Sequence, residues 1–189
     1  MKGCVFTCFL DATKVFDRVD HVKLFDKLTK RGVPAYIIRL LIFWYMNQTM
    51  CVKWGRSMSE LFHVTNGVRQ GGILSPYLFS IYIDDLSEEL NLIRVGCVMN
   101  DMIINHILYA DDIVLISPSS RGLDQLIKCC ERFGIEHNII FNVNKCAVIS
   151  FKSEFMPKFN VSEFKLNRGV ISLFDDCKFL GHILSSNMK

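Results

Sequence analysis

The chain has 189 residues, of which 50% are hydrophobic and 22% are charged, enough for one globular domain with a sizeable core. Eleven glycines and four prolines are too few for a collagen-like or a Pro/Gly-rich disordered chain. The formal net charge of +3 neither requires nor excludes a nucleic-acid partner, because a basic groove can lie beside an acidic site without changing the total.

Eight cysteines are spread along the chain, and none forms a CxxC pair. Most lie inside apolar runs and no secretory signal precedes them, so we interpret them as reduced core thiols of an intracellular protein rather than as metal ligands or disulfide partners. The most apolar stretch, from Ala35 to Met46, is interrupted by Arg39 and is shorter than the roughly 20 residues that a membrane span needs. We therefore expect a soluble protein without a membrane partner.

The first part of the chain is predicted to form a strand and then a helix. Cys4 to Leu10 is a short apolar run that favours a buried strand, and the strand delivers the carboxylate of Asp11 at its carboxyl end. After a loop, Asp20 has the side chain of a helix N-cap, and the helix is expected to end at Lys30.

Further helices and short strands are predicted along the rest of the chain. Pro34 opens a second helix that runs to about Asn47, and because it is apolar nearly all round we expect it to be buried. Next come a hairpin over 49–54 and 60–65 around Gly55, a loop from Gly67 to Gly72, and a helix that is opened by Ser75 and Pro76 and runs to about Leu90. Three short strands then lie between Ile93 and Ser117, with breaks at Asn100-Asp101 and Asp111-Asp112. A helix from about Arg121 to His137 follows, with Leu123, Leu126, Ile127 and Cys130 on one face. The tail from Ile139 is predicted to form short strands.

The order of these elements favours the α+β class. Strands and helices intermix without regular βαβα alternation, and the central hairpin is antiparallel. We expect a sheet covered by helices. No segment is rich enough in linker residues to mark a boundary, so residues 1–189 are expected to form a single domain.

Three Asp-Asp pairs occur, and their surroundings separate them. Asp84-Asp85 falls in a helical pattern and Asp175-Asp176 in a turn between strands, so a solvated surface explains both. Asp111-Asp112 instead lies between two strongly apolar, β-branched runs, at the tip of a predicted tight hairpin. Adjacent carboxylates repel each other, and a hard divalent cation relieves that repulsion. An ordinary polar turn and a metal site both fit this pair, and Asp11 could supply a third carboxylate from its own strand end.

Five segments carry a more specific pattern. They are Phe9-Leu10-Asp11-Ala12-Thr13-Lys14-Val15-Phe16-Asp17, Gly67-Val68-Arg69-Gln70-Gly71-Gly72-Ile73-Leu74-Ser75-Pro76, Tyr109-Ala110-Asp111-Asp112, Asn142-Val143-Asn144-Lys145 and Phe179-Leu180-Gly181-His182. The first three resemble motifs A, B and C of reverse transcriptases, above all those of non-LTR retrotransposons of the long interspersed element type. The last two are similar to motif D and to the motif that positions the primer. Five motifs in the family's order are hard to obtain by chance.

The resemblance implies a polymerase palm, with a ferredoxin-like antiparallel sheet backed by helices, that acts as an RNA-directed DNA polymerase. In this interpretation Asp11, Asp111 and Asp112 are catalytic and hold two Mg²⁺ ions, with Mn²⁺ as the alternative. Lys145 is the fourth catalytic residue and assists the pyrophosphate leaving group. Without the motif, a lone lysine at a strand edge is simply exposed to solvent.

The resemblance also implies contacts to nucleotide, template and primer. The nucleotide and template residues would be Phe16, Arg69, Gln70, Gly71, Tyr109 and Ala110, and the primer-positioning residues Phe179, Leu180 and Gly181. The ring of Phe16 would lie against the sugar of the incoming deoxynucleoside triphosphate and exclude a 2′ hydroxyl. An ordinary core phenylalanine is the alternative for Phe16, and a helix-entry loop is the alternative for residues 67–72.

The sequence also departs from the family. It begins just before Phe9 and ends just after the primer-positioning motif, so we expect a palm that lacks the N-terminal fingers segment and the thumb. The expected partners are an RNA template, a DNA primer and deoxynucleoside triphosphates, together with the missing segments or other proteins of the host element. Two hypotheses follow. One is a reverse transcriptase palm, and the other is a non-catalytic remnant of a retrotransposon that binds RNA or protein.

Overall fold

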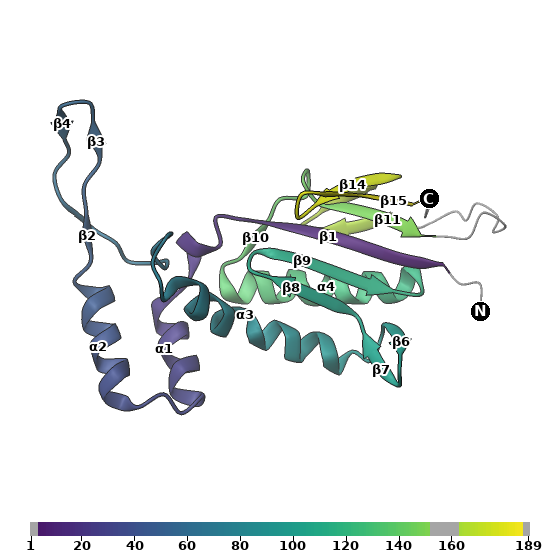
Figure 1. Ribbon diagram of the computed structural model, residues 1–189, viewed down its shortest axis with the longest axis horizontal. Helices are drawn as coiled ribbons and strands as arrows, with labels where there is room; N and C mark the ends of the chain where they lie inside the picture. Colours follow the sequence, from purple (N-terminus) through teal and green to yellow (C-terminus); the bar gives the residue numbers. More distant parts are fainter. Residues whose placement is uncertain (1–3, 152–162, 187–189) are drawn as a thin grey trace. The chain divides into compact units, whose positions relative to one another are not determined.

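Figure 1 shows the computed structural model of the chain, which describes residues 4–151 and 163–186. The chain packs as two compact units. We call Lys14–Ile83 the helix-ribbon unit, and the described residues of 4–13 and 84–186 the sheet unit. Each unit is described by itself below. The prediction of one palm domain without fingers and thumb segments stays a prediction.

The sheet unit is built on a seven-stranded sheet. Its order is β12-β13-β11-β1-β9-β8, and β10 also pairs with β1. All of these pairings are antiparallel except that of β11 with β13. The mixed α+β class with a mainly antiparallel sheet is therefore confirmed. The strands are β1 (Val5–Thr13), β8 (His106–Tyr109), β9 (Asp112–Ser117), β10 (Ile140–Phe141), β11 (Ala147–Phe151), β12 (Phe164–Leu166) and β13 (Gly169–Leu173).

Strand β1 is central because both of its faces are apolar. Cys8 and Leu10 are buried on one face and Phe9 on the other. Helix α4 (Ser120–His137) packs against β1 and β9 (Figure 1). It buries the predicted apolar face of Leu123, Leu126, Ile127 and Cys130. The hairpin of β14 (Asp176–Phe179) and β15 (His182–Ser185) joins the core cluster around Phe9.

The predicted strand region before α4 holds four strands rather than three. They are β6 (Cys97–Met99), β7 (Met102–Ile104), β8 and β9. The break at Asn100-Asp101 is confirmed, and both residues have positive φ, as a tight hairpin turn requires. The second break lies one residue earlier than predicted, because Asp112 is already the first residue of β9 and pairs with Tyr109.

The helix-ribbon unit contains α1 (His21–Lys30), α2 (Ala35–Met46) and the start of α3 (Ser75–Leu92), which continues into the sheet unit. The Asp20 N-cap is confirmed, since its carboxylate accepts hydrogen bonds from the backbone N–H groups of Val22 (2.8 Å) and Lys23 (3.1 Å). A short 3₁₀ helix, η1 (Phe16–Arg18), precedes α1. The predicted hairpin is a β-ribbon in which β2 (Thr49–Met50) pairs with β5 (Phe62–His63) and β3 (Lys53–Trp54) with β4 (Ser57–Met58).

The prediction that the second helix is buried is wrong. Only Ile38, Leu41 and Tyr45 of α2 are buried, at the i, i+3, i+7 spacing of a single stripe. Tyr36 and Phe43 are 73% and 68% exposed. A helix buries only the stripe that meets a neighbour, and α1 is that neighbour here. Apolar composition alone does not supply a partner for the other faces.

The cysteines are unpaired, and most of them are buried as predicted. All eight thiols are free, and five of them are buried. Within residues 4–151 and 163–186, no helix combines the length and the apolar character that crossing a membrane requires.

Candidate active site

The central pairing of the sheet unit sets Asp11 directly opposite Asp112. The register of β1 and β9 runs from Phe6 opposite Ser117 to Asp11 opposite Asp112. Cβ atoms of directly opposed residues lie about 4.5–5.5 Å apart, and their side chains share a face. The predicted proximity of Asp11 to the Asp111-Asp112 turn is therefore confirmed. Strand pairing rather than loop contacts creates it.

Asp111 lies at the tip of the hairpin next to this pair. Tyr109 pairs with Asp112, so Ala110 and Asp111 form a two-residue loop. Ala110 has φ 52°, a left-handed conformation that costs an L-residue about 1–2 kcal/mol. Tyr109 and Asp111 are exposed. The turn therefore presents a carboxylate and a ring to solvent at the cost of backbone strain, which is common at functional sites.

The three carboxylates repel one another. Burial raises the pKa of Asp112 above its ordinary value, and the negative charges of Asp111 and Asp11 raise it further. Asp112 therefore lies near both other carboxylates, and a bound cation would relieve the repulsion that it experiences.

Among the described residues, Lys145 is the only cation that pairs with Asp11. Its Nζ lies 3.7 Å from Oδ2 of Asp11, with the two side chains 65% and 38% exposed. The backbone sets this position. Strand β10 pairs with Ala12 and Thr13, β11 pairs with residues 5–9, and the turn between them lies opposite Asp11. The N–H of Asn142 donates to the Asp11 carbonyl at 2.9 Å, and the N–H of Lys145 to the Asn142 carbonyl at 2.9 Å.

The donor set suits a hard divalent cation. Asp11, Asp111 and Asp112 offer carboxylate oxygens only, the ligands that Mg²⁺ and Mn²⁺ prefer. As the side chains stand, no three His, Cys, Asp or Glu residues of the described chain form a metal-holding group. The support for a cation site is therefore the strand register, which places Asp11 opposite Asp112.

The predicted primer-positioning segment packs on the same face of the sheet. The rings of Phe179 and Phe9 lie with centroids 5.1 Å apart, and Phe9 precedes Asp11 by two residues on β1. Leu180 and Gly181 form the turn of this hairpin with φ 46° and 83°. The β14–β15 hairpin is thus fixed to the sheet face that carries Asp11.

In the helix-ribbon unit, backbone hydrogen bonds join the loop that begins at Gly67 to the residues around Phe16. The N–H of Gly67 donates to the Val19 carbonyl at 2.8 Å, and the N–H of Val68 donates to the Phe16 carbonyl at 2.7 Å. Nε2 of buried His21 bonds the Gly67 carbonyl at 2.7 Å. Gly67 has φ +90°, and a Cβ there would lie 2.9 Å from Cα of Asp17. Only glycine fits this approach.

Phe16 has a packing partner within its own unit. Its ring stacks on that of Phe79 with centroids 4.8 Å apart and planes at 26°. Phe79 is fully buried, whereas Phe16 is half-buried. The Phe79 ring therefore covers one face of the Phe16 ring. The contact with a nucleotide sugar stays a prediction.

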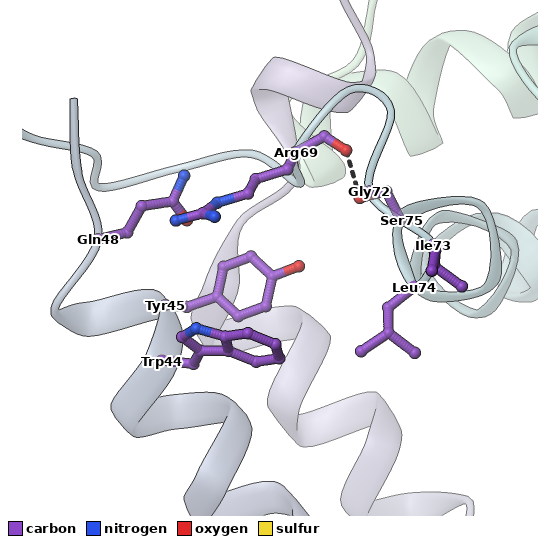
Figure 2. Close-up of a pocket in the computed structure, with 8 residues that line it drawn as sticks. All are labelled: Trp44, Tyr45, Gln48, Arg69, Gly72, Ile73, Leu74 and Ser75. Atoms are coloured by element: carbon purple, nitrogen blue, oxygen red, sulfur yellow. Dashed lines mark hydrogen bonds between the residues drawn. The ribbon is translucent and has the colours of Figure 1, made fainter. Parts of the chain in front are cut away.

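Arg69 and Gln70 line two cavities of the helix-ribbon unit. A cavity of about 400 Å³ lies between the end of α2 and the start of α3, with the Arg69 guanidinium directed toward Gln48 (Figure 2). The hydroxyl of Ser75 donates to the Arg69 carbonyl and fixes the loop. A second cavity, of about 690 Å³, is lined by Arg69, Gln70 and the base of the ribbon. Gly71 is exposed beside them, with φ +80°.

Sequence reasoning missed the aromatic wall of the first cavity. Trp44 and Tyr45 line it from the end of α2, and Tyr45 is buried while Trp44 is 58% exposed. Burial raises the pKa of Tyr45, and the positive charge of Arg69 opposes that shift. The signal in the sequence was that α2 is apolar nearly all round. A single neighbouring helix covers only one stripe of it, so other apolar side chains remain to line a cavity or face solvent.

The predicted site residues divide between the units. The sheet unit brings together Asp11, Asp111, Asp112 and Lys145, and also holds Tyr109, Ala110, Phe179, Leu180 and Gly181. The helix-ribbon unit brings together Phe16, Arg69, Gln70 and Gly71. The chemical role of each residue stays a prediction.

Solved structures with a similar fold include telomerases. Telomerase from Candida tropicalis, in complex with the TWJ fragment of telomeric RNA, matches with a TM-score of 0.66 at 15% identity, over 90% of this chain and 30% of that one. The apo enzyme from the same species, truncated from its C-terminal domain, matches with a TM-score of 0.67 at 15% identity, over 97% and 34%. This likeness confirms the predicted polymerase palm fold.

Sequence relatives come from retrotransposable elements. The chain is 29% identical to the Pol polyprotein of the type-2 element R2DM of Drosophila melanogaster, over 82% of its own length and 14% of the relative. It is 27% identical to the RNA-directed DNA polymerase of the mobile element jockey of Drosophila funebris, over 96% and 20%. The chain thus spans a fifth or less of these relatives. The family model described as reverse transcriptase (RNA-dependent DNA polymerase) matches residues 1–184, and the chain therefore belongs to the reverse transcriptase family.

Proposed function

We propose that this chain is the palm of an RNA-directed DNA polymerase that adds deoxynucleotides to the 3′ hydroxyl of a DNA primer on an RNA template. The observation that carries the proposal is the register that opposes Asp11 to Asp112, with Asp111 beside them, in a member of the reverse transcriptase family. Phosphoryl transfer needs clustered carboxylates and little other acid–base chemistry.

Asp11, Asp111 and Asp112 would hold Mg²⁺ or Mn²⁺ as a pair of ions. When bound, such ions activate a hydroxyl nucleophile and offset charge that develops on the phosphate. Lys145 stands next to Asp11 on a backbone-fixed turn, so its ammonium is available as a proton donor to the leaving pyrophosphate. The β14–β15 hairpin, fixed to Phe9 through Phe179, would position the primer end.

The helix-ribbon unit would bind the nucleotide and the template. Arg69 lines both cavities, Gln70 lines the second, and Gly71 is exposed beside them, which suits contact with a template base and its phosphate. The half-buried ring of Phe16 would exclude a 2′ hydroxyl from the incoming nucleotide. Tyr109 and Ala110 would contact the nucleotide next to Asp111.

Primer extension tests this function. The chain would be assayed on an RNA template with deoxynucleoside triphosphates, alone and as a chimera in which it replaces the matching segment of a jockey-type polymerase. We expect little extension by the chain alone and clear extension by the chimera, abolished by Asp11→Asn and by Asp112→Asn. Asp101→Asn, an exposed carboxylate at another hairpin turn of the same unit, is the matched control and should leave extension intact. A folded chimera without activity, beside an active parent enzyme, would instead indicate a non-catalytic remnant.

A further inference from the structure

The two units differ strongly in net charge. The helix-ribbon unit, Lys14–Ile83, has ten Lys and Arg residues against four Asp and Glu, a net charge of +6. The remaining 119 residues have twelve against fifteen, a net charge of −3. Between Asp26 and Asp84 the only carboxylate side chain is that of Glu60. The mild total of +3 therefore conceals a strongly basic unit, which is the charge pattern of a nucleic-acid contact.

The β-ribbon Thr49–His63 projects from this unit with almost nothing packed on it (Figure 1). Every residue of the ribbon except Cys51 is exposed. Its paired segments are only two residues each, and an isolated two-stranded ribbon is marginally stable in water. The ribbon buries little of its own surface, so its side chains are free to bind another molecule.

The tip of the ribbon combines an aromatic ring with two cations. Trp54 is 85% exposed, although tryptophan is highly buried on average. Lys53 precedes it, and the Gly55-Arg56 turn follows, with φ 60° at Gly55. Tryptophan and arginine are enriched in protein interfaces as well, but single-stranded nucleic acids are bound by rings that stack on bases and by cations that contact phosphates. The net charge of +6 on this unit favours a polynucleotide as the partner.

The base of the ribbon continues into the loop assigned to the template. Met50 and Phe62, which pair across the ribbon, line the 690 Å³ cavity together with Arg69 and Gln70. A strand that lies along the ribbon would therefore lead to the loop of residues 67–72. Within the described helix-ribbon unit, no ion pair involves Lys53, Arg56 or Arg69, so these cations are available to phosphates.

We propose that the ribbon Thr49–His63 binds the unpaired template strand, with a base stacked on Trp54 and phosphates in contact with Lys53 and Arg56. The identity of the strand as template rests on the proposed polymerase function. The binding of single-stranded RNA does not, because it needs neither the carboxylates nor a nucleotide.

The test is the binding of a fluorescein-labelled oligouridylate of about 12 nucleotides to the 189-residue chain, followed by anisotropy over a range of salt concentrations. We expect Trp54→Ala to weaken binding about tenfold, the effect of losing one stacked base, and Trp54→Phe to restore most of it. Arg56→Gln should lower the slope of log K against log salt by about 0.7, the value for one phosphate contact on a single strand.

Met58→Ala is the matched control. It removes a 65% exposed apolar side chain from the residue opposite Lys53 but no ring, so binding should not change. Equal weakening by Met58→Ala and Trp54→Ala, or unchanged binding in Trp54→Ala, would overturn the ribbon proposal. Asp112→Asn should bind RNA normally while losing extension in the chimera. Failure of the ribbon proposal and failure of the polymerase function are thus separate outcomes.

Discussion

The ammonium of Lys145 lies 3.7 Å from Oδ2 of Asp11, and both side chains are substantially exposed. Exposed pairs of this kind contribute only about 0–1 kcal/mol to folding. The chain contains a close match, because Lys128 pairs with Asp124 on α4 at 2.6 Å with nearly the same exposure. The two lysines differ in their surroundings, since Lys145 stands at the carboxylate cluster and Lys128 on a helix surface.

This pairing predicts separate effects on rate and on stability. Lys145→Met should slow nucleotide addition by the chimera about 100-fold, as expected for loss of a general acid, and should change the free energy of unfolding by less than about 1 kcal/mol. Lys128→Met should leave the rate unchanged and should also change the free energy of unfolding by less than about 1 kcal/mol. Rates come from single-turnover extension and stabilities from urea denaturation. A rate for Lys145→Met equal to that of Lys128→Met would remove the proton-donor role.

Divalent cations should stabilise the chain through Asp11 and Asp112. A cation that binds only the folded state adds about 1.4 kcal/mol to stability at ten times its dissociation constant. We expect Mg²⁺ to raise the melting temperature of the wild-type chain and to have little effect on Asp11→Asn or Asp112→Asn. Asp101→Asn should respond like the wild type. An equal Mg²⁺ response in all four proteins would contradict a cation site at this pair.

Acid should destabilise the chain through His106. Burial lowers the pKa of His106, which lies between the Ser87 hydroxyl at 2.7 Å and the Asn105 side-chain oxygen at 2.6 Å. Above a pH of about 6.5 the ring is neutral in both folded and unfolded chains. As the pH falls below that value the unfolded chain takes up the proton first, so stability decreases until the lowered folded pKa is passed.

The measurement is the free energy of unfolding between pH 7.5 and about pH 5, in the range where histidine titrates. The wild type should lose stability over this range, and His106→Gln should lose less. His182→Gln, which changes an exposed histidine of the same unit, should keep the wild-type slope. A wild-type slope in His106→Gln would show that other groups account for the acid sensitivity.

Two glycines of the 67–72 loop should differ in their tolerance of a side chain. Gly67→Ala adds a Cβ 2.9 Å from Cα of Asp17 and from the Phe16 carbonyl, at φ +90°. Gly71→Ala has φ +80° but open space around it, so only the backbone conformation costs energy, about 1–2 kcal/mol. We expect Gly67→Ala to lower the free energy of unfolding clearly more than Gly71→Ala does in urea titrations. Equal losses would contradict the close approach at Gly67.

Phe16 should affect sugar selection if its free side faces the nucleotide. Phe16→Ala opens space for a 2′ hydroxyl, so the ratio of deoxyribonucleotide to ribonucleotide incorporation by the chimera should fall. Loss of the stack on Phe79 should also cost stability, at most about the 3–5 kcal/mol typical of a buried phenylalanine. Phe79→Leu disturbs the same stack from its buried side and is the control. An unchanged ratio in an active Phe16→Ala chimera would assign Phe16 to packing alone.

Local sequence patterns were enough to predict most elements of the fold. The Asp20 cap, the apolar face of α4 and the Asn100-Asp101 turn each depend on residues close together in the chain, and each is present. The apolar run of β1 likewise predicted a buried strand that carries Asp11. These features follow from short-range capping, periodicity and turn preferences, which can be read from the sequence alone.

Only the tertiary structure decided which residues lie opposite each other and which stay exposed. The register that sets Asp112 against Asp11, the turn that brings Lys145 to Asp11, and the exposure of Phe43 on α2 all depend on which segments pair or pack together. A one-residue shift of β9 would move its side chains to the other face of the sheet without any change in local pattern. The sequence by itself determined the elements and the motifs, and long-range pairing decided which of them meet, because register and burial are properties of two segments rather than of one.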